Sequence, residues 1–142
     1  MVIVAAVDRS DRAADVIAEA AELAAAFDEP VHVVHVITRA EFTDLNLANV
    51  EESGKPVDIE RIREFATDVA IDAAADLEVP TEAVGLMGKP AERVVEYAEN
   101  EDARYVVIAP RRRSRTGKAL FGSVAQAIIL NSDRPVVTTT RQ

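Results

Sequence analysis

Short apolar segments alternate with longer amphipathic segments along the chain. The apolar segments contain few polar positions, which is typical of strands buried on both faces of a parallel sheet. The segments between them repeat apolar residues every three to four positions, which predicts helices. The predicted strands are Val2–Val7, Val31–Ile37, Ala83–Met87, Tyr105–Ala109 and Pro135–Thr139, and the predicted helices are Arg12–Phe27, Asp58–Leu77, Pro90–Asn100 and Val124–Leu130.

One segment interrupts this alternation. Residues Thr38–Pro56 are polar and charged without a clear period, and Gly54 stands near their end. We interpret the segment as a long loop, with a short helical piece around Leu45–Val50 as an option. Loops of this length in compact domains are usually functional or mobile.

The order of strands and helices predicts an α/β fold, a Rossmann-like, doubly wound parallel sheet of five strands with helices on both faces. Ligands of such sheets bind beyond the carboxyl ends of the strands, where the strand order reverses. The 142 residues fit one globular domain, and no linker or internal repeat is visible. We therefore predict a single domain over residues 1–142.

Composition narrows the classes of function. The 25 acidic and 16 basic residues give a net charge of −9, and aromatic residues make up 4% of the chain. Such a surface repels nucleic acids and anionic lipids, and few rings are available for base stacking. The absence of cysteine excludes disulfides, thiolate metal sites and cysteine nucleophiles.

The chain carries no sign of export or membrane insertion. Met1–Val7 enters an apolar run without a basic leader, and no apolar run approaches the roughly 20 residues of a membrane span. We expect a cytoplasmic protein. The acid-rich, Lys-poor and Ala-rich composition suggests a halophilic protein that works in a salty cytoplasm, and it fits an ordinary acidic protein equally well.

A basic segment stands out against this acidic background. Arg111–Lys118 holds five of the 16 basic residues and no acidic one, and it follows a predicted strand. Gly122 and Ser123 then open the next predicted helix, so the segment is placed to hold an anion. Two alternatives remain open. Ser123 and Gln126 fit a capping box that merely closes the helix, and the arginines can be solvated or paired with acids across a dimer.

Other candidate chemistry is sparse. The chain has neither a G-x-G-x-x-G motif nor a complete P-loop. His32 and His35 lie three apart on a predicted strand and point to opposite faces, so we interpret them as packing residues. No nucleophile with a base is evident, and no set of metal ligands.

Asp8 follows the first strand and faces the predicted crevice. It is placed to accept a hydrogen bond from a ribose hydroxyl or an adenine amino group. Its alternative role is to cap the following helix with Ser10 and Asp11.

Five short motifs stand in order along the chain: Val7-Asp8-Arg9-Ser10, His35-Val36, Gly88-Lys89-Pro90-Ala91, Phe121-Gly122-Ser123-Val124 and Asp133-Arg134-Pro135-Val136-Val137. Taken together, they resemble the universal stress protein family along essentially the whole chain. The family implies the strand order 3-2-1-4-5 and a homodimer formed through the last strand, here Pro135–Thr140.

Nucleotide-binding members carry the pattern G-x2-G-x9-G-[ST]. This chain keeps Gly122 and Ser123 but has Ala109 and Arg112 in place of the first two glycines. The Arg112 side chain either fills the space beside the phosphates or supplies a guanidinium, as the other arginines of 111–115 also can. The resemblance implies a site in which Ala6 and Asp8 lie near base and ribose, Val36 lies against adenine with Ile108 and Ala109 beneath it, and Arg112, Gly122, Ser123 and Val124 lie near the phosphates.

The predicted function is therefore that of a cytoplasmic universal stress protein, a homodimer that binds ATP or another adenine nucleotide as a regulatory ligand. We expect regulated binding rather than fast chemistry, with at most slow ATP hydrolysis. The alternative is a dimerisation or interaction module of the same fold whose pocket is filled. A third reading, an adenylating ligase domain, would need an additional substrate domain.

Overall fold

Five parallel strands form the central sheet of the computed structural model, which describes residues 1–55, 58–110, 112–113 and 119–139. Their order is β3-β2-β1-β4-β7. The strands are β1 (Val2–Ala6), β2 (Val31–Ile37), β3 (Thr81–Met87), β4 (Ala103–Ile108) and β7 (Val136–Thr138). Counted over the strands of this sheet, the order is 3-2-1-4-5, so the predicted doubly wound α/β fold is confirmed.

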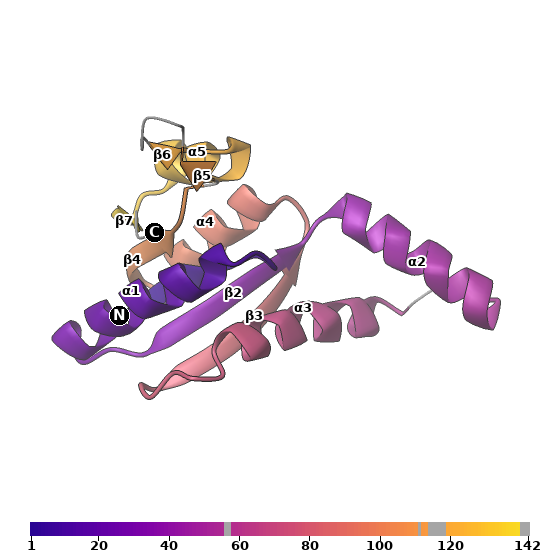
Figure 1. The fold of residues 1–142 in the computed structure, drawn as a ribbon, viewed down its shortest axis with the longest axis horizontal. Helices are drawn as coiled ribbons and strands as arrows, with labels where there is room; N and C mark the ends of the chain where they lie inside the picture. The colour runs from indigo at the N-terminus through magenta and orange to yellow at the C-terminus, as the bar shows by residue number, and fades with distance from the viewer. Residues whose placement is uncertain (56–57, 111, 114–118, 140–142) are drawn as a thin grey trace.

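Helices cover both faces of the sheet (Figure 1). Helices α1 (Arg12–Phe27) and α3 (Ile59–Ala73) pack on one face, and α4 (Pro90–Asn100) and α5 (Ser123–Asn131) pack on the other. The central strand β1 serves both layers, since Ile3 and Ala5 pack with α1 while Val4 packs with α4 and α5. All three side chains are fully buried. Burial on both faces explains why this strand is a continuous apolar run.

The structure corrects the interpretation of Thr38–Pro56 as a loop, and the short helical piece considered around Leu45–Val50 is part of a longer helix. Residues Arg39–Ser53 form helix α2, which begins where the Thr38 Oγ1 accepts the Glu41 N–H at 3.1 Å. It ends at Gly54, whose φ of +74° is the left-handed conformation that suits glycine after a helix. No residue of α2 is buried, so the helix lacks the buried face that creates a 3.6-residue period. The end signals, Thr38-x-x-Glu41 and Gly54, were present in the sequence.

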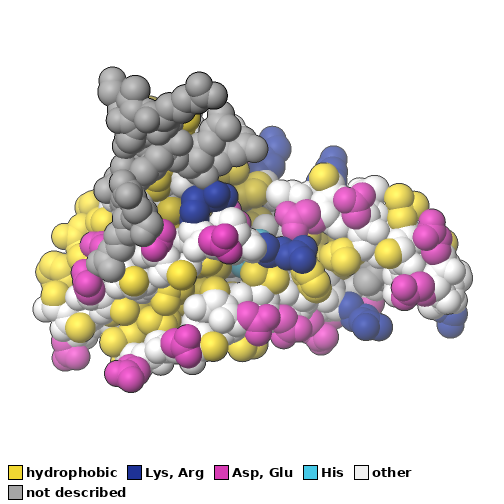
Figure 2. Space-filling view, in the orientation of Figure 1, with side chains coloured by type: hydrophobic (Ala, Val, Ile, Leu, Met, Phe, Trp, Pro, Cys, Tyr) yellow, Lys and Arg dark blue, Asp and Glu magenta, His cyan; other side chains and the backbone are white. Residues whose placement is uncertain are grey.

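Helix α2 extends away from the sheet (Figure 1). Its surface mixes hydrophobic and acidic side chains (Figure 2), and Leu47 and Val50 are both exposed. Near its first turns, Phe42 and Leu45 pack against Ile37 and Ile62 of the body.

A further difference is a short antiparallel pair that the pattern did not predict. Strand β5 (Arg112–Arg113) pairs with β6 (Ala119–Leu120), between β4 and α5. Strands of two residues are too short to show any alternation. The remaining elements agree with the predictions apart from shifts at their ends, the largest at the end of α3, which stops at Ala73 rather than Leu77.

His32, in β2, makes polar contacts with two side chains from neighbouring elements. Its Nδ1 lies 2.7 Å from the Tyr97 hydroxyl of α4, and its Nε2 lies 3.4 Å from a Glu82 carboxylate oxygen of β3. Burial, with the charges of Glu101 and Glu82, raises the pKa of Tyr97 above its ordinary value. The hydroxyl therefore keeps its proton, and it forms a hydrogen bond with the His32 Nδ1. These contacts join three elements and support the interpretation of His32 as a packing residue.

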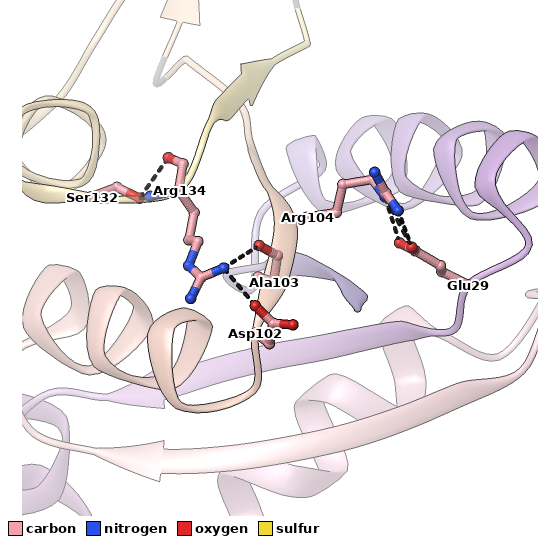
Figure 3. Close-up of polar contacts among 6 residues, drawn as sticks. All are labelled: Glu29, Asp102, Ala103, Arg104, Ser132 and Arg134. Atoms are coloured by element: carbon pink, nitrogen blue, oxygen red, sulfur yellow. Dashed lines mark hydrogen bonds and ion pairs between the residues drawn. The ribbon is translucent and has the colours of Figure 1, made fainter.

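Two arginines tie the start of β4 to neighbouring turns (Figure 3). Arg104 donates to both carboxylate oxygens of Glu29, at 2.6 to 3.0 Å, and its guanidinium lies 4.4 Å from the centre of the Phe27 ring. Arg134, just before β7, donates to Asp102 at 2.7 Å. The first pair anchors the turn between α1 and β2, and the second anchors the edge strand.

The Glu29–Arg104 pair predicts a pH dependence of stability. Hydrogen bonds from Arg104 hold the pKa of Glu29 below its ordinary 4.5, although burial opposes them. The folded state thus binds fewer protons than the unfolded state, so the pair stabilises the fold above about pH 4.5 and the contribution is lost as the pH falls. We expect Arg104→Gln to reduce the loss of unfolding free energy between about pH 6 and pH 3, measured by urea denaturation.

The control is Arg63→Gln, which removes an exposed pair with Glu60 within α3. Its unfolding free energy should fall with pH as that of the unmodified protein does. A pH profile of Arg104→Gln that is as steep as that of the unmodified protein would contradict the assignment.

Candidate functional site

A cavity of about 430 Å³ opens at the carboxyl end of the sheet. It lies beyond the ends of β1, β2 and β4 and is bordered by the first turns of α1, α4 and α5. The sheet order reverses at this place, because the chain adds β2 and β3 on one side of β1 and β4 and β7 on the other. A reversal of strand order leaves room between the connecting loops, which is where ligands of this class of sheet bind.

Eight of the nine residues of the predicted site line this cavity. They are Ala6, Asp8, Val36, Ile108, Ala109, Gly122, Ser123 and Val124. The ninth, Arg112, lies in β5 opposite Leu120, and its side chain is outside the described residues. The prediction that Arg111–Lys118 holds an anion also falls largely outside them. Pro110, which follows β4, is buried and is not among the lining residues.

Asp8 is held in place by the first turn of α1. It accepts hydrogen bonds from the backbone N–H and the hydroxyl of Ser10, and the Arg12 guanidinium lies 3.3 Å from its second oxygen. Partial desolvation raises the pKa of Asp8, whose side chain is 58% exposed, but these hydrogen bonds and the Arg12 charge outweigh it, so the pKa lies below its ordinary 3.8. Asp8 is therefore a carboxylate at neutral pH, and its oxygens retain capacity for a further donor.

The alternative role of Asp8 as a helix cap is only indirect. The Ser10 hydroxyl, not Asp8, accepts the Arg12 N–H at 3.3 Å, and Asp11 makes no side-chain capping bond. Asp8 orients Ser10 and Arg12, and it lines the cavity together with Arg12.

The start of α5 differs from the predicted capping box. Gly122 is the N-cap residue and Ser123 is already the first helical residue, so the Ser123 hydroxyl does not cap the helix. Gln126 donates its side-chain amide to the Phe121 carbonyl at 2.8 Å instead of closing a box. The first N–H groups of a helix have no partner within the helix, and they attract anions. Gly122 and Ser123 line the cavity at this point.

Four polar lining residues were not predicted as site residues: Arg12, His35, Thr38 and Glu41. Thr38 and Glu41 come from the first turn of α2, and they were missed because this segment was interpreted as a loop. His35 was interpreted as a packing residue, and only its place directly before Val36, at the end of β2, indicated that it could reach the site.

The other cavity walls are largely apolar. Val16 of α1, Val94 of α4 and Ile128 of α5 line the cavity between the polar groups. An apolar cavity with a few convergent polar groups is typical of a small-molecule site. Over the described ranges, no group of three or more potential metal ligands occurs, and no helix has the length and apolar character needed to cross a membrane.

The sequence model of the universal stress protein family matches residues 1–139. The chain belongs to the universal stress protein family. It is 25% identical over 147 residues to a universal stress protein of Methanocaldococcus jannaschii, with 98% of this chain and 81% of the relative aligned. Members of this family thus provide the comparison for its fold and site.

Two solved structures from Archaeoglobus fulgidus share the fold over nearly the whole chain. One universal stress protein is 33% identical, with a TM-score of 0.71 and 97% of each chain covered. The other, solved in complex with dAMP, is 30% identical, with a TM-score of 0.68, and covers 97% of this chain and 96% of its own.

Proposed function

We propose that this universal stress protein binds an adenine nucleotide in the cavity at the carboxyl end of the sheet, as a regulatory ligand in the cytoplasm. The observation that carries the proposal is that one apolar cavity is bordered by both a hydrogen-bond acceptor and a group of hydrogen-bond donors. Asp8 offers a carboxylate, and the start of α5 offers backbone N–H groups beside Ser123. A nucleotide has a hydrogen-bond donor end and an anionic end that match them.

The charges determine how the ligand is oriented. The ribose hydroxyls and the adenine amino group can donate to Asp8, whereas a phosphate there would be repelled by the carboxylate. The phosphate would instead lie against Gly122 and Ser123, where helix N-termini favour negative charge. Val36, Ile108 and Ala109 supply apolar surface for the base.

The A. fulgidus relative supports a nucleotide with one phosphate, since it was solved with dAMP. This chain has Ala109 and Arg112 at the positions of the first two glycines of the nucleotide-binding pattern. Because glycine allows phosphates to approach the backbone closely, its replacement bears most on the outer phosphates. We therefore expect AMP to bind at least as well as ATP, and any ATP hydrolysis to be slow.

The ligand that the protein carries tests this proposal. Protein purified gently in high potassium chloride is precipitated with acid, and the supernatant is analysed by mass spectrometry against the protein concentration. An adenine nucleotide near one per chain would support the proposal and identify the ligand. An empty supernatant, together with no heat on titration with AMP or ATP, would favour the interaction module with a filled pocket.

We also propose a homodimer formed through the last strand, Pro135–Thr140, of which Thr140 lies outside the described residues. Strand β7 is an edge strand, so one side of its backbone has no neighbour within the sheet. Next to it in the chain, α5 exposes Ile129 and Leu130. An apolar edge of this kind suits pairing with a second copy.

The pairing can be blocked without breaking the sheet. Thr139 donates its N–H to Ile108 of β4, so by alternation Thr138 directs its N–H to the open side. We expect Thr138→Pro, which removes that donor, to weaken the dimer at least roughly tenfold in analytical ultracentrifugation. Thr138→Val keeps the N–H and should dimerise as the unmodified protein does. A monomeric unmodified protein, or a dimer untouched by Thr138→Pro, would contradict this interface.

A further inference from the structure

His35 presents a buried nitrogen that the fold itself does not use. The side chain is 4% exposed, and its Nδ1 lies 2.9 Å from the Val7 carbonyl oxygen. A carbonyl only accepts hydrogen bonds, so the Nδ1 carries the ring proton. In the neutral imidazole this leaves Nε2 as an acceptor.

Within the described residues, Nε2 is buried and has no hydrogen-bond partner. A buried polar atom without a partner destabilises a protein, and native structures rarely contain one. His35 also lines the cavity, and the carbonyl that fixes its tautomer belongs to the peptide bond leading into Asp8. The imidazole ring is thus next to the end of β1 that carries the carboxylate of the candidate site.

We propose that His35 is a specificity-determining residue of this cavity, and that its Nε2 accepts a hydrogen bond from the nucleoside part of the ligand. The inference rests on the proposed nucleotide binding and deepens it. The N–H and O–H donors of an ionised adenine nucleotide are the adenine amino group and the ribose hydroxyls, while its phosphate oxygens only accept. His35 therefore favours ligands that present a donor to it and disfavours a phosphate.

The variant His35→Asn separates the two ring nitrogens. The asparagine amide nitrogen stands close to the position of Nδ1 and can still donate to Val7, but no atom reaches the position of Nε2. Isothermal titration would compare AMP with three analogues that each lack one donor: purine riboside 5′-monophosphate, 2′-deoxy-AMP and 3′-deoxy-AMP.

We expect His35→Asn to weaken AMP binding roughly tenfold, as loss of one buried hydrogen bond does. The unmodified protein should bind one of the three analogues more weakly than AMP by a similar factor. His35→Asn should bind that analogue as tightly as it binds AMP. The analogue that shows this coupling identifies the donor as the amino group or one of the hydroxyls. Unchanged AMP affinity in His35→Asn, or equal losses on all four ligands, would overturn the inference and leave nucleotide binding intact.

The tautomer provides a second readout that is independent of affinity. In a long-range ¹H–¹⁵N spectrum, the Nε2 resonance of His35 should move toward that of a hydrogen-bonded nitrogen when AMP is added. A resonance that is already shifted in the free protein and does not move would assign the partner to a buried water, and it would overturn the inference. If the folded, unmodified protein binds none of the four ligands, the proposed function itself fails, and the role of His35 falls with it.

Discussion

Asp8→Asn should weaken AMP binding about 10- to 100-fold, the largest loss expected from any single polar group of the cavity. Hydrogen bonds to a charged group contribute about 1.5–3 kcal/mol, and asparagine would replace one carboxylate oxygen by a donor. Asp8 is ionised at neutral pH because Ser10 and Arg12 hold its pKa below the ordinary value despite partial desolvation. The measurement is isothermal titration of AMP at neutral pH.

The matched control for this variant is Asp11→Asn. Asp11 stands three residues further on, is exposed, makes no side-chain capping bond, and is not among the cavity residues. Its AMP affinity should stay within about twofold of the unmodified protein. If Asp8→Asn binds AMP as tightly as the unmodified protein does, Asp8 does not contact the ligand. A loss of similar size in both variants would point to a general effect of charge.

Gly85→Ala should have the largest effect on stability. A methyl group at Gly85, in β3, would lie 2.4 Å from the Thr67 backbone nitrogen and 2.6 Å from the Arg63 carbonyl oxygen. Both atoms belong to the backbone of α3, so the helix as a whole would have to move away from the sheet. We expect a loss of about 3 kcal/mol or more in the free energy of unfolding, measured by urea denaturation.

A second glycine isolates the contribution of this close packing. At Gly54, an added methyl group would meet no atom within 4 Å, and only the left-handed backbone, with φ of +74°, opposes it. Gly54→Ala should therefore reduce the free energy of unfolding by about 1 kcal/mol. Equal losses at the two positions would mean that α3 does not press on β3 at Gly85.

The fold was largely predictable because the buried positions of its strands and helices create the apolar patterns seen in the sequence. Strand β2 is buried at every position and α1 has one buried face, and for both elements the predicted and observed bounds agree. Helix α2 was predicted only as an optional short piece around Leu45–Val50, since it buries no residue and thus shows no period. Its presence was encoded only in the capping residues Thr38 and Gly54.

The lining of the candidate site was predictable where it rests on motifs at the ends of strands. Asp8, Val36 and Gly122 come together because parallel strands end at the same edge of the sheet. His35 was not predicted as a site residue, because the hydrogen bond that fixes its tautomer is donated to the carbonyl of Val7, 28 residues away in the chain. The role of Ser123 was ambiguous in the sequence, since the same letters fit a capping box, and only the geometry assigns the N-cap to Gly122.

The most direct test of nucleotide binding in this cavity is a titration of the ¹⁵N-labelled protein with AMP, followed by backbone amide resonances. We predict saturable shifts, consistent with one site per chain, that are largest for Asp8, Val36, Ala109 and Ser123, residues from four separate segments that line the one cavity. No saturable shift, or shifts confined to the opposite edge of the sheet around Arg104 and Arg134, would contradict the account.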